Sequence, residues 1–122
     1  MVLVVDDYQP MCQALQKLLS MRSIPARCAY SAADAWKELL ASAPDVVLLD
    51  DAMPGKNALE LLQDMKATPA LAHIPVVMYS AGDDPKRIAQ AIRQGAVDWF
   101  VKAITPWERL LARLQELHVR PA

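Results

Sequence analysis

Short apolar runs alternate along the chain with longer stretches in which apolar residues recur every three or four positions. The runs span residues 2–5, 45–49, 74–79 and 98–101, and a weaker one spans 26–30. Continuous apolar runs as short as these are typical of parallel strands that are buried on both faces. The pattern therefore predicts five buried strands.

The stretches between these runs have the spacing of amphipathic helices. Apolar stripes at 11–19 and 107–117, together with the segments 57–67 and 85–94, predict four helices. A fifth helix is expected after Ser31, because serine is a favourable N-cap residue.

Local signals mark where several of these helices begin and end. Ser31 is followed three residues later by Asp34, Asp84 is followed by Pro85, and Gly95 is typical of a left-handed helix end. Strands and helices thus alternate strictly, with short connections. Because a parallel return needs a crossover, this order predicts a doubly wound α/β fold, a three-layer sandwich with helices on both faces of a parallel sheet.

Composition places the chain among compact single-domain proteins. The 122 residues are the size of one domain, which we take to span 1–122, and 54% of them are hydrophobic, 22% are charged and only 3 are glycine. The net charge of -1 and the absence of long runs of like charge argue against direct binding of nucleic acid.

Two further features bear on location. No apolar run approaches the roughly 18 residues that span a bilayer, so no membrane segment is expected. Cys12 and Cys28 lack the spacing of zinc ligands and are interpreted as two buried thiols in a reducing compartment. We therefore expect a cytoplasmic protein.

Polar side chains follow the apolar runs where the strands are expected to end. Asp6 and Asp7 follow the first strand in chain order, Asp50 the third, Ser80 the fourth and Lys102 the fifth. In an open α/β sheet the carboxyl ends of the strands flank the ligand crevice. In a sheet of strand order 2-1-3-4-5, these side chains converge on one crevice.

Carboxylates gathered in this way repel one another by on the order of 4 kcal/mol per pair at about 4 Å and an effective dielectric constant of about 20. A divalent cation offsets that repulsion, and an all-oxygen ligand set favours Mg²⁺, with Mn²⁺ as the alternative. A simpler alternative for a single residue is helix capping, which Asp7 could supply to a helix that begins near Pro10.

The same residues resemble the receiver domain of two-component response regulators of the chemotaxis-regulator type, over nearly the whole chain. The motifs that carry this resemblance all follow predicted strands, and they are Asp6-Asp7, Asp50 in the sequence DDAMPG, Ser80-Ala81, and Lys102. The resemblance implies a flavodoxin-like (βα)5 fold with the parallel strand order 2-1-3-4-5. It also implies a signalling switch rather than an enzyme that acts on a separate substrate.

By this resemblance Asp50 is the phosphoacceptor, which takes a phosphoryl group from the phosphohistidine of a sensor histidine kinase or a histidine phosphotransfer protein. Asp7 and Asp50 would ligate Mg²⁺ directly, and Asp6 would act through water. The main-chain carbonyl of Ala52 would be a further protein ligand.

The resemblance also implies how the phosphoryl group is held and sensed. The Ser80 hydroxyl, the Lys102 ammonium and the backbone at Ala52 and Ala81 would contact its oxygens. Movement of Ser80 would open space beside Trp99 and change the face made by the fourth helix, the fifth strand and the fifth helix. A downstream protein, not identified by the sequence, would bind that face, and association of two copies there is left open.

Two positions depart from the family pattern. Receivers usually follow the lysine with proline through a cis bond, whereas Ala103 follows Lys102 here, and a cis bond without proline costs about 3 to 4 kcal/mol. We therefore predict a trans Lys102–Ala103 bond with a rearranged loop at 102–106. Ser80 keeps the hydroxyl but lacks the β-branch of threonine, which predicts looser placement of that hydroxyl.

Alternative functions stay open at this point. A receiver-like module that binds proteins without being phosphorylated is favoured by Ala103 and by Trp99, which stands where receivers more often carry Tyr or Phe. A dehalogenase-type phosphatase would use Asp50 as its nucleophile, but it needs a second acid where Ala52 stands. Asp51 alternates to the other side of its strand from Asp50 and is interpreted as a bystander at the rim.

Overall fold

The computed structural model describes residues 1–51 and 57–118, and the predicted strands and helices all form within these ranges. The strands are β1 (Val2–Val5), β2 (Ala26–Ala29), β3 (Val46–Leu49), β4 (Val76–Ser80) and β5 (Asp98–Val101). The helices are α1 (Gln9–Ser20), α2 (Ala32–Ala41), α3 (Ala58–Ala67), α4 (Pro85–Arg93) and α5 (Trp107–His118).

The strands form one parallel sheet in the order β2-β1-β3-β4-β5, which confirms the predicted flavodoxin-like topology. Val5 of β1 is in register with Leu49 of β3. The residues that follow, Asp6 and Asp50, therefore emerge level with each other at the carboxyl edge of the sheet. This register brings together carboxylates that lie far apart in the sequence.

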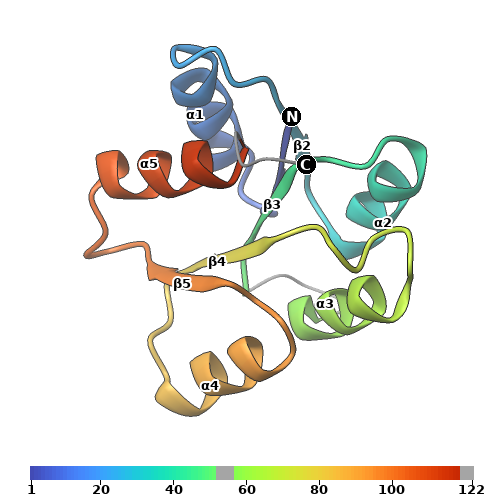
Figure 1. Ribbon diagram of the computed structural model, residues 1–122. Helices are drawn as coiled ribbons and strands as arrows, with labels where there is room; N and C mark the ends of the chain where they lie inside the picture. Colours follow the sequence, from blue (N-terminus) through green and yellow to red (C-terminus); the bar gives the residue numbers. More distant parts are fainter. Residues whose placement is uncertain (52–56, 119–122) are drawn as a thin grey trace.

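Helices cover both faces of the sheet, so the molecule has three layers (Figure 1). Alternate residues of each strand enter two separate cores. Even-numbered residues of β1 and β3 pack with α1 and α5, and odd-numbered residues pack with α2, α3 and α4. Because both faces are covered, β1, β3 and β4 are buried along their whole length, as their continuous apolar runs predicted.

Most of the predicted helix signals are present in the structure. The Ser31 hydroxyl accepts a hydrogen bond of 3.1 Å from the backbone N–H of Asp34 at the start of α2. The Asp84 carboxylate accepts one of 3.1 Å from the N–H of Lys86 at the start of α4. Gly95 has φ 111°, the left-handed conformation expected after α4.

The start of α1 differs from the alternative in which Asp7 caps the first helix. Tyr8 is the N-cap of α1 and makes no side-chain capping bond, so the alternative in which Asp7 caps this helix is wrong. The backbone N–H of Tyr8 instead donates to the Asp6 carboxylate at 3.0 Å. Asp7 is thereby left exposed beside the crevice.

The prediction of two buried thiols holds for Cys12 but not for Cys28. Cys12 is fully buried on α1, and this burial is the main reason why its pKa is raised to about 12. Cys28 is only partly buried, because β2 is an edge strand with a single neighbour in the sheet. None of the helices in the described part of the chain is both long and apolar enough to cross a bilayer.

Candidate functional site

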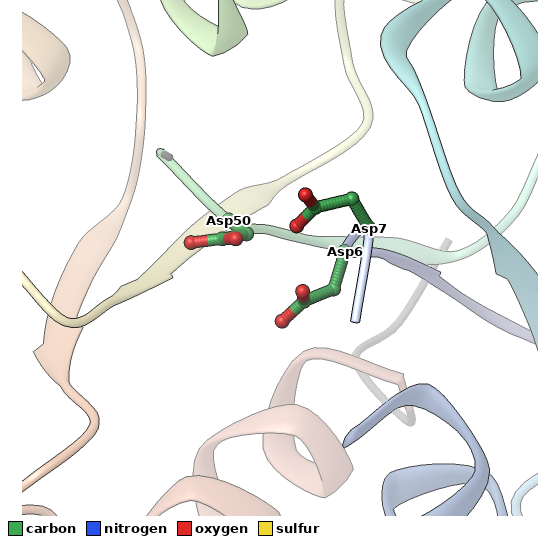
Figure 2. Close-up of side chains that lie close together, drawn as sticks. All are labelled: Asp6, Asp7 and Asp50. Carbon is green, nitrogen blue, oxygen red and sulfur yellow. The ribbon is translucent and has the colours of Figure 1, made fainter. Parts of the chain in front are cut away.

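Three carboxylates surround one point at the carboxyl edge of the sheet. Figure 2 shows Asp6 and Asp7 projecting from the end of β1 and Asp50 projecting from the end of β3. One carboxylate oxygen from each residue lies within 4.8 Å of the others. Asp6 and Asp50 are only 3% and 5% exposed, whereas Asp7 faces solvent. The structure thus brings together the three acids that the sequence placed in one crevice.

The sheet fixes the backbone of both buried acids. The N–H of Asp6 donates to the carbonyl of Ala29 on β2 at 3.0 Å, and the N–H of Asp50 donates to the carbonyl of Val5 on β1 at 2.9 Å. Each acid therefore extends the strand ladder by one residue. The position of the Asp50 carboxylate is consequently set by the central strands.

Lys102 lies between the two buried acids. Its ammonium donates to Asp6 Oδ2 at 2.7 Å and lies 3.7 Å from Asp50 Oδ1. Burial alone lowers the pKa of Lys102, but the hydrogen bond to Asp6 and the charges of Asp50 and Asp6 outweigh that effect, so this pKa is raised above its ordinary value. Lys102 therefore carries a full positive charge at neutral pH.

The trans bond predicted after Lys102 is confirmed, whereas the predicted rearrangement of the loop at 102–106 stays a prediction. The peptide bond from Lys102 to Ala103 is trans, since the described residues contain no cis peptide bond. The N–H of Lys102 donates to the carbonyl of Ser80 at 2.8 Å and so joins the ends of β4 and β5. With this trans bond, the Lys102 ammonium sits 1.0 Å closer to its Asp6 partner than to Asp50, from 2.7 and 3.7 Å.

An aromatic ring lies beneath the ammonium, a feature that sequence reasoning did not identify. Lys102 Nζ is 5.6 Å from the centre of the Tyr79 ring, within the range of a cation–π contact. Tyr79 is 4% exposed, and its ring lies 6.3 Å from that of Trp107 in a tilted arrangement. The only sequence signal was an aromatic residue directly before Ser80.

Ser80 and Trp99 both bond the loop that leads to α4. The Ser80 hydroxyl is 1% exposed, and its oxygen accepts a hydrogen bond of 3.2 Å from the N–H of Gly82. The indole N–H of Trp99 donates to the carbonyl of Gly82 at 3.1 Å, while its ring packs against the core on the α2–α4 side. Ala81 is exposed on the same loop, and Ala52 lies outside the described residues.

Asp51 has a partner that the sequence did not reveal. Arg87 of α4 binds both oxygens of the Asp51 carboxylate at 2.8 to 3.1 Å and also donates to Asn57 Oδ1 at 3.2 Å. The hydrogen bond to Asp51 is the main reason why the pKa of Arg87 is raised. Asp51 and Arg87 are 36 residues apart, and no local sequence pattern links them.

The three carboxylates fit a small divalent cation. Mg²⁺ binds oxygen at about 2.0 to 2.1 Å, so two of its ligand atoms can be at most about 4.2 Å apart. The observed separations of up to 4.8 Å need only a slight rotation of the side chains to meet that limit. Oxygen donors without histidine or thiolate suit Mg²⁺ or Mn²⁺ and do not suit zinc.

Comparison with known proteins decides the family. Residues 2–115 match the family described as the response regulator receiver domain. The chain belongs to this family. It is therefore a receiver domain of the two-component response regulators, whose members typically act as signalling switches, with phosphorylation and Mg²⁺ as usual features of the family.

Individual relatives agree with this assignment. The chain is 30% identical over 114 residues to the phosphate regulon transcriptional regulatory protein PhoB of Pseudomonas aeruginosa. The matched residues cover 93% of this receiver and 49% of that protein. This receiver thus spans about half the length of that curated relative.

Solved structures include close matches to the whole fold. The BeF3-activated N-terminal receiver domain of Klebsiella pneumoniae RstA is 27% identical, with a TM-score of 0.88 and coverage of 98% of both chains. The chemotaxis protein CheY4 of Vibrio cholerae is 25% identical, with a TM-score of 0.86 and coverage of 95% of this chain and 96% of that one.

Proposed function

We propose that Asp50 of this receiver accepts a phosphoryl group from the phosphohistidine of a sensor histidine kinase or a histidine phosphotransfer protein. The observation that carries the proposal is the meeting of Asp50 with Asp6, Asp7 and the Lys102 ammonium at one point of the sheet edge. A carboxylate is a competent nucleophile, and phosphoryl transfer depends mainly on positioning and on neutralising charge.

The transfer exchanges one bond for another. An oxygen of the Asp50 carboxylate forms a bond to phosphorus while the bond between phosphorus and the donor imidazole nitrogen breaks, and the electron pair of that bond returns to the imidazole. Asp7 and Asp50, with Asp6 acting through water, would hold Mg²⁺, or Mn²⁺ in its place. The bound cation would supply positive charge to the phosphoryl oxygens.

Lys102 and Ser80 have separate tasks in this proposal. The Lys102 ammonium, already within 3.7 Å of Asp50, would shift from Asp6 toward a phosphoryl oxygen. The Ser80 hydroxyl would donate to another oxygen, and a shift of Ser80 toward that oxygen would draw with it the loop that contains Gly82, whose N–H donates to the Ser80 oxygen. The backbone at Ala81, and at Ala52 by resemblance, would contact the remaining oxygens.

That loop movement would carry the signal to a binding surface. It changes the surroundings of the Trp99 indole, which donates to Gly82 in the present arrangement. We propose that the downstream protein binds the α4-β5-α5 face. Ile92 of α4 and Val97, which precedes β5, are 45% and 41% exposed and are apolar groups that a partner could cover. A second copy of this receiver is an alternative occupant of the same face.

Labelling with a small phosphodonor tests the proposal. Incubation with acetyl phosphate and Mg²⁺, followed by intact mass measurement, should show the gain of one phosphoryl group. The Asp50→Asn variant should show no gain, whereas the matched variant Asp51→Asn, changed at the adjacent carboxylate, should still be labelled. Removal of Mg²⁺ with a chelator should strongly reduce labelling of the native chain.

The possible results separate the functions left open by the sequence. Absence of any adduct, under conditions that label another receiver, would refute phosphorylation and leave a module that binds partners without it. Release of phosphate from monoesters over many turnovers would instead support a phosphatase. Beryllofluoride offers a second probe, since the Klebsiella pneumoniae RstA receiver is described as BeF3-activated.

A further inference from the structure

Asp51, Asn57 and Arg87 form a cluster beside the acceptor, which we call the α4 clamp. Arg87 donates to both oxygens of Asp51 and to Asn57 Oδ1, so its guanidinium is held by two residues at once. The side chains of Arg87 and Asp51 are 30% and 16% exposed. A bidentate, partly buried pair of this kind has a better-defined geometry than an ordinary surface ion pair.

The α4 clamp joins the segment that bears the acceptor to a helix of the proposed output face. Asp51 directly follows Asp50. Asn57 is the N-cap of α3, where its Oδ1 also accepts from the N–H of Leu59 at 2.7 Å. Arg87 is the third residue of α4. The first turn of α4 is therefore tied to both flanks of residues 52–56.

The same side of the sheet carries the groups that must move. Leu49 of β3 is in register with Met78 of β4, so Asp51 and Ser80 emerge from neighbouring strands at the same level. Only residues 81–84 separate Ser80 from the first residue of α4. Because this connection is short, holding α4 in place restrains movement of the loop that begins at Ser80.

We propose that Arg87 is a positioning residue of the switch: through Asp51 and Asn57 it holds α4 in the arrangement in which Ser80 and Trp99 both bond Gly82, and it thereby opposes the activated arrangement. The inference rests on the proposed phosphorylation of Asp50. The α4 clamp makes no contact with the reacting atoms and acts through the position of α4 and its preceding loop.

Two variants distinguish this role from a simple effect of charge. Arg87→Gln and Asp51→Asn both break the α4 clamp, but the first removes a positive charge near Asp50 and the second removes a negative one. If the α4 clamp restrains the switch, both variants shift the midpoint of activation in the same direction. If the local electric field dominates, the two variants shift it in opposite directions.

The shift is measured by titration with beryllofluoride at fixed Mg²⁺, followed by the NMR signal of the Trp99 indole N–H, which is assigned with Trp99→Phe. Both variants should reach half activation at roughly two- to fivefold lower beryllofluoride than the native chain, from the range measured for single ion pairs. Arg93→Gln is the matched control, because Arg93 is an exposed arginine in the last turn of the same helix. This control should leave the midpoint unchanged.

Shifts in opposite directions, or an equal shift in Arg93→Gln, would overturn the inference. Combining Arg87→Gln with Asp51→Asn should give no larger shift than either alone, because the two residues act as one unit. A purely structural role would lower the stability of both variants without moving the activation midpoint, and that result would also overturn it.

A second measurement keeps the inference separate from the proposed phosphorylation. If the native chain shows no response to beryllofluoride, the proposed function fails, and the α4 clamp is judged by hydrogen exchange in the unphosphorylated protein. Amides in the first turn of α4 should then exchange faster in Arg87→Gln and Asp51→Asn than in Arg93→Gln. Unchanged exchange in both clamp variants would show that Arg87 does not position α4.

Discussion

Two aspartate–cation pairs stand on opposite sides of the acceptor, and they differ mainly in burial. The side chains of Asp6 and Lys102 are 4% and 19% exposed and lie on the side of α1 and α5. Asp51 and Arg87 are 16% and 30% exposed and lie on the side of α4. The buried pair sets the charge around Asp50, whereas the more exposed pair sets the position of a helix.

This difference follows from strand alternation. Asp50 and Asp51 are adjacent in sequence, but one continues the face of β3 that packs with α1 and α5 and the other continues the opposite face. Two neighbouring carboxylates are thus directed to different cations and different tasks. Asp51, interpreted from sequence as a bystander, has a defined partner.

The largest expected contrast between the two pairs is in stability. Lys102→Met leaves Asp6 buried without its ammonium and should lower the free energy of unfolding by about 2 to 3 kcal/mol at pH 7 without Mg²⁺, somewhat below the cost of breaking a fully buried pair. Arg87→Met should cost about 0.5 to 1 kcal/mol. Urea unfolding followed by circular dichroism gives both values.

Arg93→Met is the control for that comparison, since it removes an exposed cation from α4 without breaking either pair. Its free energy of unfolding should stay within about 0.5 kcal/mol of the native value. Equal losses in Lys102→Met and Arg87→Met would contradict the idea that burial separates the two pairs.

Mg²⁺ should sharpen the contrast by a smaller amount. A cation that binds only the folded state at about ten times its dissociation constant raises the free energy of unfolding by about 1.4 kcal/mol. This gain in the free energy of unfolding should be larger in Lys102→Met, because the competing ammonium is gone. In Arg87→Met it should equal the gain of the native chain. It should fall in Asp7→Asn. Thermal unfolding with Mg²⁺ or a chelator measures these gains, and an unchanged gain in Asp7→Asn would remove Asp7 from the metal site.

Alkaline pH should weaken the Asp6–Lys102 pair before the Asp51–Arg87 pair. Its effect on the free energy of unfolding should be smaller than those of the substitutions and of Mg²⁺. The pKa of Lys102 is raised above 10.5 in the folded state, so its contribution to stability is complete below pH 10.5 and is lost as the pH rises through the raised value. The hydrogen bond to Asp51 raises the pKa of Arg87 above its already high ordinary value, so this residue stays charged throughout that range.

The stability of Lys102→Met should therefore fall less steeply than that of the native chain between pH 10 and 11, by under about 1 kcal/mol in total. Arg87→Met should fall in parallel with the native chain. Cys12, whose pKa is also raised, is present in all three proteins and cancels from the difference between the curves. Tyr79 does not cancel fully, because the Lys102 charge lowers its raised pKa, so the difference reports the Lys102 ammonium together with its effect on Tyr79. Three parallel curves would contradict the role given to the Lys102 ammonium.

Much of the fold could be predicted because it depends on local patterns. Continuous apolar runs indicated the strands, caps such as Ser31 and Asp84 marked helix starts, and strict alternation limited the topology to a parallel sheet. The start of α1 was less predictable. A carboxylate at a strand end can cap the next helix or face a crevice, and only the path of the chain after β1 decided for Asp7.

The residues that form the site could be predicted because they directly follow the predicted strands. The carboxyl edge of a parallel sheet had to gather Asp6, Asp7, Asp50 and Lys102, whatever the details of packing. The distances from the Lys102 ammonium to Asp6 and to Asp50 depend on the rotamer of Lys102 and on the loop that follows it. Differences of 1 Å of this kind arise from packing against residues such as Tyr79 and cannot be read from spacing.

The sequence by itself therefore determined which residues reach the edge of the sheet, because strand order and alternation are short-range consequences of the apolar pattern. The tertiary structure decided which cation each carboxylate meets. The pairing of Asp51 with Arg87 depends on the rotation and distance of α4 relative to β3, and these are set by the packing of the core between them. Two carboxylates that are neighbours in the chain thereby acquire separate partners.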